Sequence, residues 1–490
     1  MKNFLINYLA NNTTSLLVKV LFSVILIAVV LSFFSIITAT AILFFIFLFS
    51  LTLALILKCN IGKRELFILL SIGFLIHFSL ISFIYVTGFN PVGGGADYQG
   101  YHSMGKEIAG RIWAGNFSLE GVRGGHDFTL LVGVAYALFY PDILVGNVLV
   151  LWFFCLSLIF SYMIIMEMGC SRKVAFLAGL LILLYPSYLY FGSLLLKDTL
   201  VIPLVLFAML LCVKILKEFS WIRLLLLFIT LIPIIHLRFY IGYAVMFGFL
   251  ASWFLVSNFK RKWLYGFYIF FLLGFSPLIL GNGYHGMDVL VEFINPEQIT
   301  IYREIAYNPN SPNNENLDPI QPGQPLPQNS DPISGGTETP SEDVPSGFGS
   351  SFVVETGLSR GPLAFTINSS LSFAYALLGP FPWQLRYGRQ NVALFETIPW
   401  YIILLMFGYC FFRAVKEKYI LYLISQKKRV IALILFSVLA LAGLSLFINN
   451  YGIIMRIRIP MVIMLIIAGC VVFDDYLENY LRKIPWLKNI

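Results

Sequence analysis

Residues 16–57, LLVKVLFSVILIAVVLSFFSIITATAILFFIFLFSLTLALIL, are apolar almost throughout and hold a single charged residue, Lys19. A membrane-spanning helix needs about 20 apolar residues, so a run of about 40 is long enough for two spans and too long for a cleaved signal peptide. We therefore expect two transmembrane helices here, one at 16–37 and one at 40–57.

The composition extends this expectation to the whole chain. Of 490 residues, 59% are hydrophobic and only 12% are charged, and the mean hydropathy is +0.84, which excludes a soluble globular protein. Further apolar runs predict an all-α polytopic membrane protein with about 12 transmembrane helices and extracytoplasmic surface helices. The net charge of +8 comes from Lys and Arg in short loops, as membrane orientation requires, so it does not indicate nucleic acid binding.

The alternation of basic loops predicts that both termini are cytoplasmic. It also divides the chain into regions. We expect three spans in 1–86, a first extracytoplasmic loop with amphipathic helices at 87–142, a transmembrane bundle at 143–280, a large extracytoplasmic loop at 281–397, and three spans with a cytoplasmic tail in 398–490. The spans expected within the bundle are 143–166, 175–196, 200–216, 224–235, 242–256 and 264–280, and a short outer turn is expected at 449–458. Within the large loop, 308–350 is rich in Pro, Asn and Gly and is predicted to be disordered.

The first extracytoplasmic loop is predicted to contain two helices. Met104, Ile108 and Ile112 recur every four residues, and Glu107 and Arg111 form an i,i+4 pair, which indicates a helix lying on the membrane surface. Residues 128–140 are apolar but shorter than a span, so we expect a second surface or half-buried helix there.

Charged residues at the outward ends of the predicted spans suggest a site for an anionic ligand. Their cations run against the positive-inside bias, and Arg is well suited to binding phosphate through paired donors. Asp97, in the segment GGGADYQGYH (93–102), fits a catalytic base, and Arg238, Arg456 and Arg458 fit a phosphate clamp. The residues expected to bind substrate are Tyr98, His102, Arg123, His126, Lys197, Asp198, Arg238, Tyr240, Arg386, Arg456 and Arg458.

Each of these features also has a simpler interpretation. Lys197 and Asp198 could form an ion pair at a helix end, and Arg456 and Arg458 could be snorkelling anchors. His102 with Asp97, and His126 with Asp127, could hold a divalent cation such as Mg²⁺ or Mn²⁺, although neither pair is assigned as a metal site. His77, alone in an apolar run, fits a core histidine.

The pattern Gly95-Ala96-Asp97-Tyr98-x-x-Tyr101-His102 after an early outward span, followed by a long outer loop and many spans, resembles the GT-C superfamily of membrane glycosyltransferases. The resemblance covers roughly residues 66–280 and is closest to the branch of protein O-mannosyltransferases and aminoarabinose transferases. It implies a polyprenyl-linked sugar donor, transfer on the outer face and a base at Asp97. Relatives often carry two adjacent acidic residues, whereas this chain has only Asp97 at that point.

These observations predict a glycosyltransferase of the bacterial inner membrane that takes a sugar from a polyprenyl-phosphate or diphosphate donor. The acceptor would be a glycan, a lipid or a protein, in cell-surface polysaccharide or glycolipid assembly. A polymerase of lipid-linked oligosaccharide repeats, of the O-antigen kind, is an alternative that depends less on Asp97 and more on the arginines. A flippase or transporter of lipid-linked glycans is a third; it is disfavoured because no internal repeat is evident and the charges lie at helix ends.

Overall fold

A computed structural model describes residues 35–58, 63–89, 96–118, 127–257, 261–270, 362–381, 394–418, 427–448 and 451–483. Most of the first predicted span, most of the large loop with its segment 308–350, and the chain termini lie outside these ranges.

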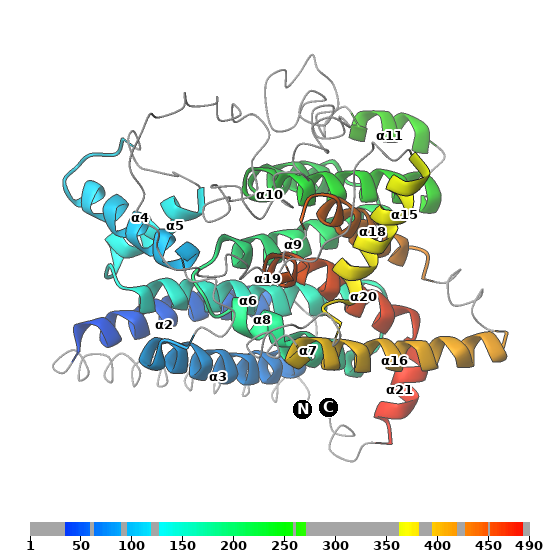
Figure 1. Cartoon of the computed structure of the whole chain (residues 1–490), viewed down its shortest axis with the longest axis horizontal. Coiled ribbons are helices and arrows are strands. Elements are labelled where there is room, and N and C mark those ends of the chain that lie inside the picture. The colour runs from blue at the N-terminus through cyan, green and yellow to red at the C-terminus, as the bar shows by residue number, and fades with distance from the viewer. Residues whose placement is uncertain are drawn as a thin grey trace, which may run out of the picture.

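The described residues are helical and contain no strand, which confirms the all-α class (Figure 1). The helices are α2 (Ile36–Lys58), α3 (Lys63–Thr87), α4 (Ala96–Trp113), α5 (Asp127–Leu138), α6 (Ile143–Glu167), α7 (Arg172–Leu183), α8 (Pro186–Phe191), α9 (Lys197–Lys217), α10 (Trp221–Val256), α11 (Lys262–Phe270), α15 (Pro362–Leu378), α16 (Leu394–Lys416), α18 (Val430–Phe447), α19 (Tyr451–Ile457), α20 (Ile459–Val472) and α21 (Asp474–Leu481).

Among the described residues, five helices are long and apolar enough to cross a membrane: α3, α6, α9, α10 and α16. The bent pair α20 and α21 would make a sixth. The protein is therefore a multi-pass membrane protein. The larger number of spans expected from the sequence is not reached within these ranges, because in α2 and several other apolar helices only 10–17 residues are described in full.

The centre of the bundle is formed by α6 and α9. Both helices are apolar on nearly all sides, as expected for helices surrounded by other helices, and most of their residues are buried. They run side by side, with α10 packed on α9 and α3 on α6 (Figure 1). By contrast, α3 and α16 expose large side chains such as Leu75 and Leu405, so they lie at the outer surface of the bundle.

The 36-residue helix α10 folds back on itself at Arg238, whose backbone is extended at φ −153° and ψ 82°. A straight helix of this length would be about 54 Å long. Instead, the rings of Phe219 and Trp253, near its two ends, lie 5.7 Å apart. The sequence prediction of an outward span ending at 235 and a returning span from 242 is therefore correct in outline, with a tight turn between them.

The predicted span at 175–196 is wrong as a continuous helix. α7 ends at Leu183, and the short α8 begins at Pro186. Proline removes a backbone donor and keeps the preceding residue out of the helical region, and Tyr185 accordingly has φ −68° and ψ 112°. The predicted outer turn at 449–458 likewise contains the short helix α19.

The two helices predicted in the first loop are confirmed as α4 and α5, which pack closely against each other. Glycines make the approach possible. A Cβ at Gly133 would lie 2.4 Å from Ile108 Cγ2, and one at Gly105 would lie 2.7 Å from Val132 Cγ1. Side chains at these positions would push the helices apart, so α4 depends on α5 for its position.

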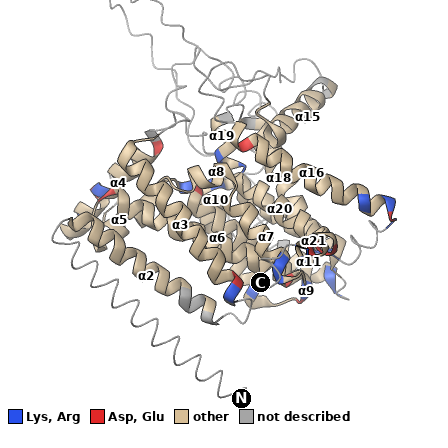
Figure 2. Cartoon of the chain, turned by 90° about the horizontal axis from the view of Figure 1, so that it is seen from below, with Lys and Arg blue, Asp and Glu red and all other residues tan. Residues whose placement is uncertain are grey.

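Charged residues gather at two opposite ends of the bundle (Figure 2). At the end predicted to be cytoplasmic, Glu167 pairs with Lys217 at 2.8 Å, joining the last turns of α6 and α9. The first turn of α9, at the other end, carries Asp198. The candidate site is built there.

Candidate functional site

Asp198, in the first turn of α9, forms the centre of the site. Its Oδ1 accepts a hydrogen bond from Arg238 Nε at 2.8 Å, and its Oδ2 accepts one from Arg238 Nη2 at 3.2 Å. This is the bidentate geometry that suits a guanidinium and a carboxylate. The pair is deeply buried, with side-chain exposures of 2% for Arg238 and 8% for Asp198, so each charge depends on the other.

The turn in α10 explains how Arg238 reaches this position. The backbone of Arg238 is extended, so this side chain projects from the turn between the two antiparallel segments of α10. Gly242 allows the fold-back, since a Cβ on it would lie 2.3 Å from Ile235 Cγ1. The position of the arginine is therefore set by the backbone of the hairpin.

Arg456, on α19, connects this buried pair to the surface. Its Nε lies 2.8 Å from Asp198 Oδ2, an ion pair without hydrogen-bond alignment, and its Nη1 donates to Asp97 Oδ2 at 2.5 Å. Burial alone would lower the pKa of Arg456, but the carboxylates of Asp198 and Asp97 raise it above its ordinary value. We call Asp97, Asp198, Arg238 and Arg456 the carboxylate–arginine cluster.

The cluster opens to the outside at Asp97. Side-chain exposure rises from 2% at Arg238 through 8% at Asp198 and 12% at Arg456 to 39% at Asp97. A ligand would therefore meet Asp97 first and Arg456 behind it. A carboxylate can accept a proton and a guanidinium can hold an anion, so the two reactive groups predicted from the sequence are adjacent in space.

Tyrosines and a lysine surround the cluster. The buried hydroxyl of Tyr240 interacts electrostatically with Arg238, Asp198 and Arg456, and Lys197 is buried beside Asp198. Tyr98 is partly buried on α4, next to Asp97. Tyr101, part of the quoted pattern but not among the residues expected to bind substrate, is buried and interacts with Arg238; its position one turn after Asp97 was the available signal.

Arg458, expected in the phosphate clamp, belongs to a different cluster. It is fully buried and donates to Glu396 Oε1 at 2.8 Å and to the carbonyl oxygens of Ala376 and Gly379 at 2.9 and 2.7 Å. Tyr185 donates to the same Glu396 oxygen. Through these hydrogen bonds Arg458 links the start of α20 to α15 and α16 inside the bundle. We call this contact the internal tie.

His102 also lies apart from Asp97. Its Nδ1 is 2.8 Å from the hydroxyl of Tyr136 on α5, so it connects the two loop helices. Burial lowers the pKa of His102 below its ordinary value of 6.5, and Lys106 lowers it further, against an opposite effect of Asp142. The neutral imidazole is favoured, as suits a helix contact.

The remaining predicted residues, Arg123, His126 and Arg386, lie outside the described residues, as does the side chain of Asp127. Within the described part of the chain, no three His, Cys, Asp or Glu side chains gather as a metal site. Asp97, the carboxylate suggested as a metal ligand, is instead paired with a guanidinium.

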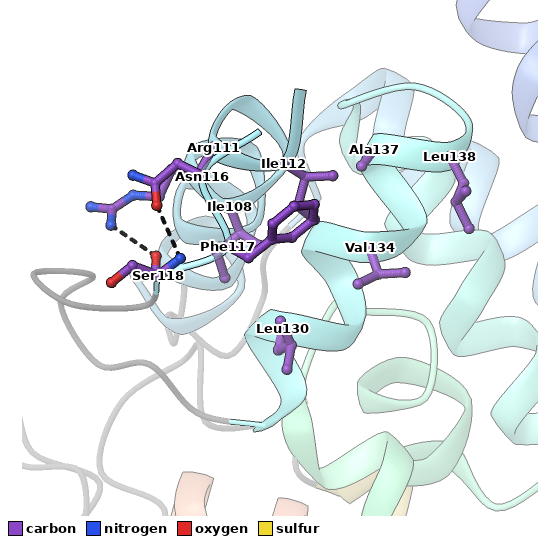
Figure 3. Close-up of a pocket in the computed structure, with 10 residues that line it drawn as sticks. All are labelled: Ile108, Arg111, Ile112, Asn116, Phe117, Ser118, Leu130, Val134, Ala137 and Leu138. Carbon is purple, nitrogen blue, oxygen red and sulfur yellow. Dashed lines mark hydrogen bonds between the residues drawn. The ribbon is translucent and has the colours of Figure 1, made fainter. Parts of the chain in front are cut away.

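A separate cavity of 310 Å³ lies between α4 and α5, lined mainly by apolar side chains such as Ile108, Ile112 and Val134 (Figure 3). Arg111 and Asn116 border it, and both form hydrogen bonds with the backbone of Ser118. None of the predicted site residues lines this cavity.

Comparisons with protein-family models, with curated proteins and with solved structures find no match to this chain.

Proposed function

We propose that the protein is a membrane-embedded glycosyltransferase that moves a sugar from a polyprenyl-phosphate or diphosphate donor to an acceptor on the extracytoplasmic face. The observation that supports this most is the pairing of a part-exposed carboxylate, Asp97, with the guanidinium of Arg456 at the edge of a buried cationic centre. Transfer from a phosphate needs both a base and a cation beside the departing oxygen.

In this proposal Asp97 accepts the proton of an acceptor hydroxyl or amine. The acceptor atom bonds to the anomeric carbon while the bond from that carbon to the phosphate oxygen breaks. The phosphate leaves with the electron pair, and Arg456 stabilises its charge. Arg238 does not touch the substrate; it fixes Asp198, which in turn orients Arg456.

Asp97→Asn tests the proposed base. Full-length protein in proteoliposomes would be supplied with a panel of polyprenyl-phosphate- and polyprenyl-diphosphate-linked sugars and acceptors, and sugar-free carrier would be measured. A positioned base contributes about 10²–10⁴-fold to a rate, so the variant should lose that much. Glu107→Gln is the matched control, because Glu107 is an exposed carboxylate on the same helix, paired with Arg111 at 2.7 Å. Wild-type rates for Asp97→Asn, or no donor turnover by the wild type, would contradict the proposal.

A polymerase of lipid-linked repeats is the second candidate, supported by the excess of cations over carboxylates when Lys197 is counted with the cluster. It predicts that Arg456→Gln abolishes activity while Asp97→Asn retains it. Arg238→Ala does not separate the two functions, because removing it would leave Asp198 buried without its main partner.

A transporter is less well supported. Its substrate site would be expected near the middle of the membrane, often at a break within a span. The break in α10 instead lies at the turn between two antiparallel segments, where Arg238 meets the first turn of α9.

A further inference from the structure

The two carboxylates that contact Arg456 differ in burial and in the number of partners that bind them. Asp198 is also bound through both oxygens by Arg238, at 2.8 and 3.2 Å, and is nearly fully buried. Among the described residues, Arg456 is the one side chain that pairs with Asp97, and Asp97 is 39% exposed. An incoming ligand would therefore displace Asp97 far more readily than Asp198.

The charge left behind by such a displacement suits an oxyanion. With Asp97 paired, two carboxylates face the cations Arg238, Arg456 and Lys197; without it, only Asp198 remains. Arg456 would then have its Nη1 donor unoccupied, beside an Nε that already lacks an aligned hydrogen bond. A buried guanidinium with open donors is a strong site for phosphate.

We infer that Arg456 is an exchange site, where a phosphate or diphosphate group replaces the carboxylate of Asp97. Displacement frees Asp97 Oδ2 to face the acceptor, so the base becomes available only when the donor phosphate is bound. The phosphate-binding part of this inference stands on the cluster alone; the link to base release rests on the proposed glycosyl transfer. No bond is made or broken in the exchange.

Binding of inorganic diphosphate and of farnesyl diphosphate to the full-length protein in detergent tests the exchange. Asp97→Asn removes the competing charge and should tighten binding about tenfold, equivalent to about 1.4 kcal/mol. Arg456→Gln should abolish binding, and Glu107→Gln should match the wild type. Unchanged affinity in either cluster variant would overturn the inference. If Asp97→Asn binds both probes more tightly than the wild type, and the gain is larger for farnesyl diphosphate, the natural ligand is a lipid carrier. If the affinity rises for inorganic diphosphate alone, the natural ligand is a soluble anion.

Hydrogen exchange in the wild type tests the same inference without relying on variants that could misfold. Saturating farnesyl diphosphate should speed backbone exchange in the first turn of α4, because Asp97 has lost its partner, while the first turn of α9 stays protected. Equal protection of both turns at saturation would overturn the exchange.

The two proposals fail separately. If diphosphate displaces Asp97 but no sugar donor is consumed, the glycosyltransferase proposal fails and the exchange site stands. If sugar is transferred but Asp97→Asn binds diphosphate no more tightly than the wild type, the exchange alone is wrong.

Discussion

At the residue scale, similar-looking arginines have different roles. Arg456 and Arg458 are two positions apart and look equivalent in the sequence, yet Arg456 is 12% exposed next to Asp97 and Arg458 is completely buried against Glu396. The difference arises because the chain stays helical through Arg458, whose N–H donates to the carbonyl of Ile454, and two residues on a helix that are two positions apart point to nearly opposite sides.

Arg458→Met tests the internal tie. It would leave Glu396 buried without its cation, a change that typically costs about 3–5 kcal/mol. We expect a markedly lower Tm in detergent. Arg458→Met combined with Glu396→Leu should recover much of the loss, since no unpaired charge is then buried. Arg482→Gln, which breaks an exposed pair with Glu478, is the control and should change stability by at most about 1 kcal/mol. Equal Tm values for Arg458→Met and Arg482→Gln would contradict this role.

At the element scale, the site depends on a turn within α10. The apolar pattern of 221–256 predicts two helical segments, and their close return is possible because residue 242 has no side chain. The same principle holds α4 against α5 at Gly105 and Gly133. These close backbone contacts therefore bring Arg238 and Asp97 into the same cluster.

Gly242→Ala tests the turn. The new Cβ would lie 2.3 Å from Ile235 Cγ1 and 3.3 Å from Ile235 Cα, so the hairpin must open. Overpacking of this kind costs about 1–3 kcal/mol and should also weaken diphosphate binding by moving Arg238. Adding Ile235→Ala removes the clashing Cγ1 and should restore diphosphate binding but not Tm, because it leaves a cavity at a buried position. The control is Gly443→Ala on α18, where nothing lies within 4 Å of the added Cβ. An unchanged Tm and affinity in Gly242→Ala would show that the turn has room to adjust.

At the scale of the whole molecule, the helices arrange charge at two ends. The end with Glu167 and Lys217 also holds the pair of Glu65 and Arg172, 3.8 Å apart. The carboxylate–arginine cluster lies at the opposite end, because Asp198 is in the first turn of α9 and Lys217 is in its last turn. The orientation predicted from basic loops places the first of these ends in the cytoplasm.

Labelling from one side of the membrane tests this orientation. Ser103 on α4 and Lys483 after α21 are exposed. They belong to opposite ends, because α4 begins at Asp97 in the cluster, whereas Asp474 at the start of α21 accepts a hydrogen bond from Ser171 just after α6. In intact cells, a membrane-impermeant maleimide should label Ser103→Cys, and should label Lys483→Cys only after permeabilisation. The wild type gives the background from native cysteines, of which the five described are buried. The reverse pattern would invert the orientation, and labelling of both from outside would contradict the two-ended arrangement.

The sequence by itself determined the membrane class and the two helices of the first loop, and it proposed Asp97, Arg238 and Arg456 as candidate site residues. Apolar periodicity and length decide these features locally, because each helix satisfies its own backbone hydrogen bonds. It did not identify Glu396, although an isolated acid at the start of an apolar helix was a usable signal.

Only the tertiary structure decided which charges are partners. Asp198 and Arg238 are 40 positions apart, and Asp97 and Arg456 are 359 apart, so no local pattern encodes their contacts. Pairing depends on where the chain turns and how closely helices pack, and those follow from glycines, a proline and burial across the whole bundle. For the same reason, only the tertiary structure separates Arg456, which is partly exposed beside Asp97, from Arg458, which is fully buried against Glu396.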